Sequence, residues 1–290
     1  MSSSIASNSD EHISFWYTPQ NHLIQKMSRG AYSDKWNFAG LLRQGETHRV
    51  KRTACDDYAK AVELEDGTFI AVVCDGAGSA AKGGIGSRVC ADKFIDYMTT
   101  RCNVEPLTVE DIRKAFSHAR AGLEEESAKY QLPIETFATT MVTITCLAES
   151  TVFAQVGDGF AVANFAHSRL EMPLVPDRGE FANQTYFLTS QNWTETLQVE
   201  TIDEPCIGCT LSTDGLQNIL ITRDDRPYEP FFTKMFGHTK NLLAAQIETS
   251  LKDFLSSSLV NAKVSDDATI IIAVKKVLDD SVESNQEDTE

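Results

Sequence analysis

Short hydrophobic runs separated by polar turns mark the first part of the chain. The regular pattern begins near Trp36 and continues through two apolar runs, residues 58–64 and 69–74. Asp66-Gly67 lies between the two runs, and an Asp-Gly pair in this position is typical of a β-hairpin. We therefore predict two paired antiparallel strands here.

Helical spacing of apolar residues follows the hairpin. It extends over residues 84–101 and again over residues 108–129. In the second segment Thr108 is followed three residues later by Asp111, which is typical of a capping box at a helix N-terminus. Each segment has one apolar face, so we predict two helices that pack on the core.

The second half of the chain returns to strand-like patterns. Strands are expected at 138–147, 151–156, 160–165, 211–213 and 269–274, and a helix at 241–255. Gly157-Asp158-Gly159 separates the second and third of these strands, and we expect an antiparallel meander there. The order of elements favours a layered α+β domain over a regular alternation of strands and helices.

Four segments describe the expected domain organisation. Residues 1–30 have little periodicity and are interpreted as an N-terminal extension of a single domain, residues 31–277. Within the domain, 166–205 is poorly periodic and is a candidate surface flap. Residues 278–290 are acidic with few apolar positions, which is typical of a disordered tail.

Charge and hydropathy narrow the classes of partner. The 290-residue chain has 42 acidic and 26 basic residues and a formal charge of −16. Binding to a nucleic-acid backbone needs clustered Lys and Arg, so we expect no nucleic-acid partner. No apolar run approaches the roughly 20 residues that span a bilayer, so we expect no membrane partner either.

The cysteines and the first residues indicate the compartment. The seven cysteines are odd in number and lack the spacing of a disulfide framework, which favours reduced thiols. Residues 1–11 are polar and lack the basic start and apolar stretch of a secretory signal. We therefore expect a cytoplasmic protein, and a monomer.

Acidic residues next to strand ends are the main candidates for chemistry. They are Asp56 and Asp57 before one strand, Asp75-Gly76 after another, Asp158 between two glycines, Asp214-Gly215, and Asp266 and Asp267 before the last strand. A single Asp-Gly is usually only a turn, so the joint pattern carries the argument. Carboxylates that converge repel each other unless cations neutralise them, and Mg²⁺ or Mn²⁺ prefers such oxygen ligands.

The order of these motifs resembles the metal-dependent protein phosphatases (PPM) of the protein phosphatase 2C type, in a bacterial-like branch. The matching segments are RTACDDYAKA, FIAVVCDGAGSAAKGGIGSRVCADKF, FATTMVTITCL with FAQVGDGFAV, LSTDGLQNIL and SDDATIIIAV, and they extend from Arg52 to Val274. The resemblance implies a sandwich of two antiparallel β-sheets flanked by α-helical layers, with a metal cleft at one end.

The resemblance also implies a set of metal ligands. Asp75 would bridge two Mg²⁺ or Mn²⁺ ions, and the carbonyl of Gly76 would help to hold one of them. Asp214 and Asp266 would bind the other ion directly.

Further residues receive supporting roles from the same resemblance. Asp57, with Asp56, would hold metal-bound waters, and Asp158 would help to bind a third ion. Arg52 would bind the substrate phosphate, because its planar donors match phosphate oxygens. The implied reaction is in-line attack on phosphorus by a hydroxide that bridges the two cations, with Arg52, Asp57 and Asp75 as the catalytic residues.

Two features depart from the family or compete with it. Many members have histidine two residues after the bridging aspartate, where this chain has Ala77. Either a metal-bound water or another group such as His48 would then protonate the leaving oxygen, although His48 as a structural residue is the simpler interpretation. Cys206 and Cys209 form an isolated C-x-x-C, a weak signal for zinc or redox chemistry.

The functional hypothesis is hydrolysis of phosphoserine or phosphothreonine in a phosphoprotein that a Ser/Thr kinase modifies. One alternative is a phosphatase-fold regulator, weakly active or inactive, that binds a phosphorylated partner. Another is hydrolysis of a small phosphate ester, because specificity would depend on residues 166–205. All the matched carboxylates are present, which favours an active enzyme.

Overall fold

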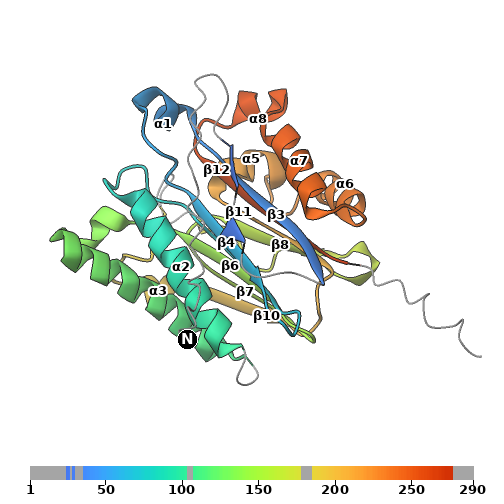
Figure 1. The fold of residues 1–290 in the computed structure, drawn as a ribbon, viewed down its shortest axis with the longest axis horizontal. Coiled ribbons are helices and arrows are strands. Elements are labelled where there is room, and N and C mark those ends of the chain that lie inside the picture. The colour runs from blue at the N-terminus through green and yellow to red at the C-terminus, as the bar shows by residue number, and fades with distance from the viewer. Residues whose placement is uncertain (1–23, 27, 30–34, 103–106, 178–184, 277–290) are drawn as a thin grey trace, which may run out of the picture.

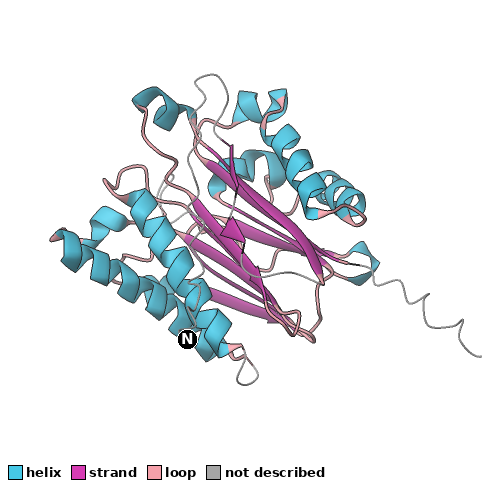
Figure 2. Ribbon diagram, in the orientation of Figure 1, coloured by secondary structure: helices cyan, strands magenta, loops and turns pink. Residues whose placement is uncertain are grey.

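Two β-sheets stacked face to face form the centre of the molecule (Figure 1). The computed structural model describes residues 24–26, 28–29, 35–102, 107–177 and 185–276. Helices cover the outer face of each sheet (Figure 2). The predicted α+β sandwich with helical layers is therefore confirmed.

Within the described residues, each sheet has six strands. The first sheet has, in spatial order, β1 (Ile24–Lys26), β3 (Trp36–Arg43), β12 (Ala268–Lys275), β11 (Gly208–Ser212), β8 (Phe160–Asn164) and β9 (Leu170–Glu171). The second sheet has β10 (Gln198–Ile202), β7 (Thr151–Val156), β6 (Met141–Cys146), β5 (Phe69–Cys74), β4 (Tyr58–Glu63) and β2 (Ser28–Arg29). All neighbours are antiparallel except β2 and β4, which are parallel.

The helices form two groups and a few short connections. The α-helices are α1 (Glu46–Lys51), α2 (Gly83–Arg101), α3 (Val109–Tyr130), α4 (Trp193–Thr196), α5 (Gln217–Leu220), α6 (Glu229–Thr239), α7 (Ala244–Leu255) and α8 (Ser258–Lys263). Short 3₁₀ turns are η1 (Ile134–Phe137), η2 (Ala166–Ser168) and η3 (Asp214–Leu216). None of the described helices has the length and hydropathy that a membrane crossing requires.

Three apolar cores hold these layers together. Between the sheets, the fully buried ring of Phe69 stacks on Trp36 and meets Phe38 edge to face, each at 5.1 Å between centroids. A second core joins α2 and α3 to one sheet, and a third joins α5 to α8 to the other. Burial of one such aromatic side chain contributes about 1.5–3 kcal/mol. Each sheet therefore packs on the other sheet through one face and on helices through the opposite face.

The local predictions for the first half of the chain are confirmed. Strands β4 and β5 pair from Tyr58 opposite Cys74 to Glu63 opposite Phe69. Helix α3 begins at a capping box in which the Thr108 hydroxyl accepts from the amide of Asp111 and the Asp111 carboxylate accepts from the amide of Thr108. These devices depend on neighbours in sequence, which explains why pattern alone found them.

The predicted meander is wrong at its last step. Strands β6 and β7 pair as expected, but β8 leaves their sheet and pairs with β11 in the other one. The chain changes sheets at Gly157, whose φ of +109° favours glycine. All three strands are buried along their whole length, so hydrophobic alternation carried no information about which sheet receives β8.

Two expected peripheral segments contribute strands in part. Residues 24–26 and 28–29 of the expected extension form edge strands β1 and β2. The expected flap, 166–205, supplies edge strands β9 and β10. The expected acidic tail, 278–290, lies outside the described residues.

Candidate metal centre

The candidate acidic residues meet at one end of the sandwich. In an antiparallel pair the end of one strand lies beside the start of its neighbour. Asp57 precedes β4, and Asp75 follows β5, its antiparallel neighbour. Asp214 follows β11, and Asp267 precedes β12, again its neighbour. Asp158 precedes β8, which pairs with β11 on the other side.

Four of these carboxyl groups repel one another where the protein largely shields them from solvent. Burial raises the pKa of Asp75 well above its ordinary value, and the negative charges of Asp57, Asp214 and Asp158 add to this. Burial, together with the charge of Asp158, raises the pKa of Asp214 to about 6, although its hydrogen bond with Asp75 acts in the opposite direction. Without a cation, Asp75 and Asp214 favour a shared proton.

Asp57 lies deepest in the cluster and is 4% exposed. Its Oδ2 accepts from Thr213 Oγ1 at 2.8 Å and Thr269 Oγ1 at 2.7 Å. Its Oδ1 is buried and accepts no hydrogen bond from the described part of the chain. Burial and the charge of Asp267 raise the pKa of Asp57 well above its ordinary value. An unpaired buried oxygen beside other carboxylates fits a centre built to receive cations or their waters.

Asp158 lies at the edge of the same cluster. Its Oδ2 accepts from Thr185 Oγ1 at 2.5 Å, and its backbone carbonyl accepts from the side chain of Gln217. These contacts fix the turn between β7 and β8. The structure therefore brings Asp158 to the centre, next to Asp75 and Asp214.

Asp267 organises the outer part of the centre. Its Oδ1 accepts from the amide of Gly45 at 2.6 Å, and its Oδ2 accepts from the amide of Asp56 at 2.7 Å. Nδ1 of His48 lies 2.8 Å from the same Oδ2, and Nε2 of His48 lies 3.2 Å from Asp56 Oδ2. Burial and Asp267 raise the pKa of Asp56, which the neighbouring His48 partly offsets.

Asp266 points to solvent at the rim of the centre. It is exposed, and its Oδ1 accepts from the amide of Asp267 at 2.8 Å. Donor atoms of His48, Asp266 and Asp267 lie within 4.8 Å of one another, and the charge of Asp266 raises the pKa of Asp214. Asp266 therefore lies within electrostatic reach of the inner carboxylates.

Gly76 and Gly215 allow backbone segments to meet at the centre. A Cβ on Gly76 would overlap the backbone of Gly83, and one on Gly215 would overlap the carbonyl oxygen of Asp267. The amide of Gly76 donates to the carbonyl of Asp56 at 3.1 Å. The glycine of each Asp-Gly pair is thus required by close packing of the strand ends.

Arg52 lies farther out, at the C-terminus of α1. Its backbone is in the left-handed region with φ of 56°, and its side chain is exposed. No described residue forms an ion pair with its guanidinium. The structure therefore places Arg52 at the end of the helix that His48 and Gly45 attach to Asp267, and does not bury it among the carboxylates.

The C-x-x-C pair lies away from this centre. Cys206 precedes β11, and its Sγ lies 3.2 Å from Sγ of Cys146 at the end of β6, with Cys209 nearby. All three thiols are buried. They are at the opposite ends of β6 and β11 from the acidic cluster.

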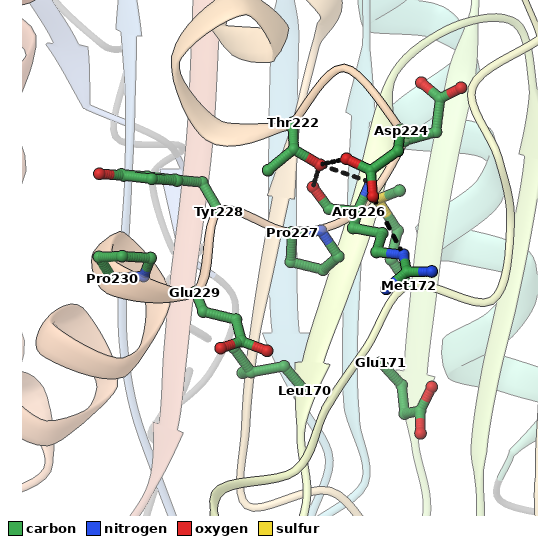
Figure 3. A pocket seen from close by; sticks show the side chains of 11 residues that line it. Leu170, Glu171, Met172, Thr222, Asp224, Arg226, Pro227, Tyr228, Glu229 and Pro230 are labelled. Atoms are coloured by element: carbon green, nitrogen blue, oxygen red, sulfur yellow. Dashed lines mark hydrogen bonds and ion pairs between the residues drawn. The ribbon is translucent and has the colours of Figure 1, made fainter.

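A surface pocket between β9 and the start of α6 is also separate (Figure 3). Its polar side chains largely satisfy one another: Thr222 Oγ1 donates to Asp224 Oδ1 at 2.8 Å, and Arg226 Nε lies 3.3 Å from Asp224 Oδ2. None of the candidate acidic residues lines it.

Three residues of the centre received no role from the sequence. Asp267, Thr213 and Thr269 contact the predicted residues directly. The signal for Asp267 was its position beside Asp266. The two threonines lie within the acidic motifs STDG and DDAT. Which aspartate of an adjacent pair faces inward depends on the strand register.

Comparison with known proteins gives a family match. The protein phosphatase 2C family profile matches residues 44–256. Serine/threonine-protein phosphatase 3 of Escherichia coli (strain K12) is 31% identical over 208 residues, which cover 70% of this chain and 82% of that protein.

Solved structures share the fold at lower identity. RsbX in complex with magnesium aligns with a TM-score of 0.51 at 16% identity over 88% of this chain and 100% of RsbX. The catalytic domain of the serine threonine protein phosphatase PstP in complex with two manganese ions aligns with a TM-score of 0.57 at 12% identity over 84% of this chain and 99% of that domain. By sequence match and fold, this chain belongs to the protein phosphatase 2C family.

Proposed function

We propose that this chain is a protein phosphatase that hydrolyses phosphoserine and phosphothreonine with two divalent cations, Mg²⁺ or Mn²⁺. The observation that carries the proposal is the set of buried Asp57 and half-buried Asp75 and Asp214, whose pKa values are raised by loss of solvent and by mutual repulsion, both of which cations would offset. When bound, the cations would activate a water and neutralise charge on the phosphoryl oxygens.

The position of each side chain in the centre indicates which proposed cation it would bind. Asp75, between Asp57, Asp158 and Asp214, is the residue proposed to contact both cations, with the Gly76 carbonyl beside it. Asp214 would hold the second cation with Asp266.

The remaining side chains act around the ligands. Asp57 and Asp56 would orient coordinated waters, and the unpaired Oδ1 of Asp57 supports this role. Asp158 would support a third cation. Arg52, exposed at the end of α1, would bind the substrate phosphate.

The regulator hypothesis predicts the same fold with a defective centre. Every carboxylate of the predicted set is present, and Asp57, Asp75, Asp158, Asp214 and Asp266 act on one another electrostatically. The phosphatase is therefore the better supported function. We also propose that the enzyme is a cytoplasmic monomer that opposes a Ser/Thr kinase in signalling.

Hydrolysis of p-nitrophenyl phosphate with Mn²⁺ tests the proposal. We expect turnover that EDTA abolishes and that is lost in Asp75→Asn and Asp214→Asn. Parallel assays on phosphoserine, phosphothreonine and phosphotyrosine peptides should favour the first two, and exclusive hydrolysis of small esters would indicate a metabolite phosphatase. Absence of turnover in a protein that binds Mn²⁺ would favour the regulator.

A further inference from the structure

His48 lies between two carboxylates of the centre. Its Nδ1 is 2.8 Å from Asp267 Oδ2 and its Nε2 is 3.2 Å from Asp56 Oδ2, and the side chain is 12% exposed. Both ring nitrogens are therefore occupied by carboxylate oxygens. His48 could reach a leaving oxygen only by breaking one of these contacts, which argues for a role through its neighbours.

Asp267 connects three segments that are distant in sequence. Its carboxylate accepts from the amides of Gly45 and Asp56 at 2.6 and 2.7 Å and also contacts His48. Gly45 begins α1, Asp56 precedes β4, and Asp267 precedes β12. The His48 side chain contacts both Asp56 and Asp267, so it closes this junction.

Helix α1 depends on the junction for its position. It has six residues, none of them buried, and Gly45 supplies no side-chain cap. A helix of this length is not stable by itself in water. Besides the contacts of Gly45 and His48 with Asp267, the amide of Glu46 donates to the carbonyl of Ser265 at 2.8 Å. Every one of these contacts joins α1 to the segment that carries Asp266.

The same helix carries the proposed phosphate ligand. Arg52 is the C-terminal cap of α1, and the amide of Thr53 donates to the carbonyl of His48 at 3.0 Å. A change in the position of His48 is therefore transmitted to Arg52 through the three helical residues between them. His48 links the phosphate-binding side of the centre to the metal-binding side.

We propose that His48 is a positioning residue of the metal centre: it fixes Asp56 and Asp267 beside Asp266 and holds α1 so that Arg52 faces the substrate. The inference rests on the proposed function for the part that concerns Arg52. Residues that orient metal ligands typically change metal affinity or activity by about 10–100-fold when they are removed. His48 should therefore affect both Mn²⁺ affinity and substrate affinity.

Variants at position 48 separate its two contacts. His48→Ala removes both; His48→Asn keeps a donor near the position of Nδ1, toward Asp267; His48→Gln keeps one near Nε2, toward Asp56. His118→Ala removes an exposed imidazole on α3 and is the matched control. Each protein is studied by Mn²⁺ titration calorimetry, by kcat and KM for p-nitrophenyl phosphate at saturating Mn²⁺, and by thermal unfolding.

For His48→Ala we expect Mn²⁺ affinity to fall by about 10–100-fold and KM to rise by a larger factor than kcat falls. His48→Asn should recover most of the Mn²⁺ affinity, because it keeps the contact with Asp267, which joins more segments of the centre than Asp56 does. His118→Ala should match the wild type. A folded His48→Ala protein with unchanged Mn²⁺ affinity and KM overturns the proposal.

Two further outcomes keep the test decisive. If His48→Ala does not fold, His48→Gln and His48→Asn provide the test: we expect folded His48→Gln, which loses the contact with Asp267, to bind Mn²⁺ more weakly than His48→Asn, and wild-type Mn²⁺ affinity in both variants overturns the proposal. If the wild type binds Mn²⁺ without hydrolysing substrate, the proposed function fails, whereas the calorimetry still supports or overturns the metal-positioning role of His48.

Discussion

The two ends of the β-sandwich both contain clusters of buried or half-buried titratable groups, carboxyl groups at one end and thiols at the other. At one end, Asp57, Asp75 and Asp214 follow or precede strand termini. At the other end, Cys146 and Cys206 are in contact, with Sγ atoms 3.2 Å apart. Both clusters are enclosed by the same two sheets, so burial alone does not distinguish them.

Charge distinguishes the two ends. Burial raises the pKa of the Cys146 thiol and keeps it neutral, and a neutral thiol packs like a small apolar group. Burial also raises the pKa of Asp75, but this carboxyl lies among other carboxyl groups. Such a cluster either holds protons or binds a cation. A bound cation would therefore stabilise the acidic end at neutral pH, and the thiol end has no comparable charge for a cation to neutralise.

The largest difference between the ends should appear in activity. Asp75→Asn and Asp214→Asn each remove a charge from the acidic cluster, and we expect kcat on p-nitrophenyl phosphate with Mn²⁺ to fall by roughly 10³-fold. Cys206→Ser, at the other end, is the matched control and should stay within about twofold of wild type. Equal losses in both sets would remove the distinction.

Without metal, repulsion at the acidic end should make the free energy of unfolding depend on pH. The native pKa of Asp214 is about 6, above the ordinary Asp value of 3.8. Stability from its protonated form is therefore complete below about pH 4 and lost as pH rises through 6.

Thermal unfolding in EDTA measures this effect. Between pH 4.5 and 7.5 we expect the metal-free protein to lose about 2 kcal/mol through this group, and Mn²⁺ at pH 7.5 should restore it. Asp214→Asn should flatten the pH dependence. A metal-free protein whose stability increases over this range would contradict the sign of the argument.

Arg52 should have a smaller effect, because it lies outside the carboxylate cluster. Arg52→Ala removes the proposed bidentate phosphate donor, and we expect KM to rise by about tenfold, equivalent to about 1.4 kcal/mol. Arg52→Lys keeps the charge and should recover part of the loss. Steady-state kinetics on a phosphothreonine peptide measure it, and an unchanged Mn²⁺ affinity is the control.

The smallest functional effect is expected at the thiols. Cys146→Ala removes one member of the buried pair and should lower the free energy of unfolding by about 1 kcal/mol. Mn²⁺ affinity and kcat should not change. Denaturant unfolding and calorimetry on the same samples check this, and a change in Mn²⁺ affinity would mean that the two ends are coupled.

Local signals in the sequence were sufficient for much of the fold. The hairpin at Asp66-Gly67 and the capping box at Thr108 are encoded by neighbouring residues, and both are confirmed. Helix α6 was missed, because its aromatic run and Gly237 obscure the pattern; Pro230 in its first turn was the usable signal. The sheet that receives β8 could not be predicted, since fully buried strands do not alternate.

The candidate centre was predictable as a list of residues and not as a geometry. Asp57, Asp75, Asp158 and Asp214 were found because each follows or precedes an apolar run. The inward position of Asp267, 4% exposed beside an exposed Asp266, depends on strand register and on its contact with His48. Contacts between segments more than 200 residues apart leave no local trace in the sequence.

Anomalous diffraction at the manganese edge, from crystals grown with Mn²⁺, tests the central claim most directly. We predict two strong peaks at the acidic end of the sandwich, with Asp75 in contact with both and Asp214 in contact with one. Well-ordered crystals that bind Mn²⁺ elsewhere, with Asp75 and Asp214 free of any peak, would contradict it.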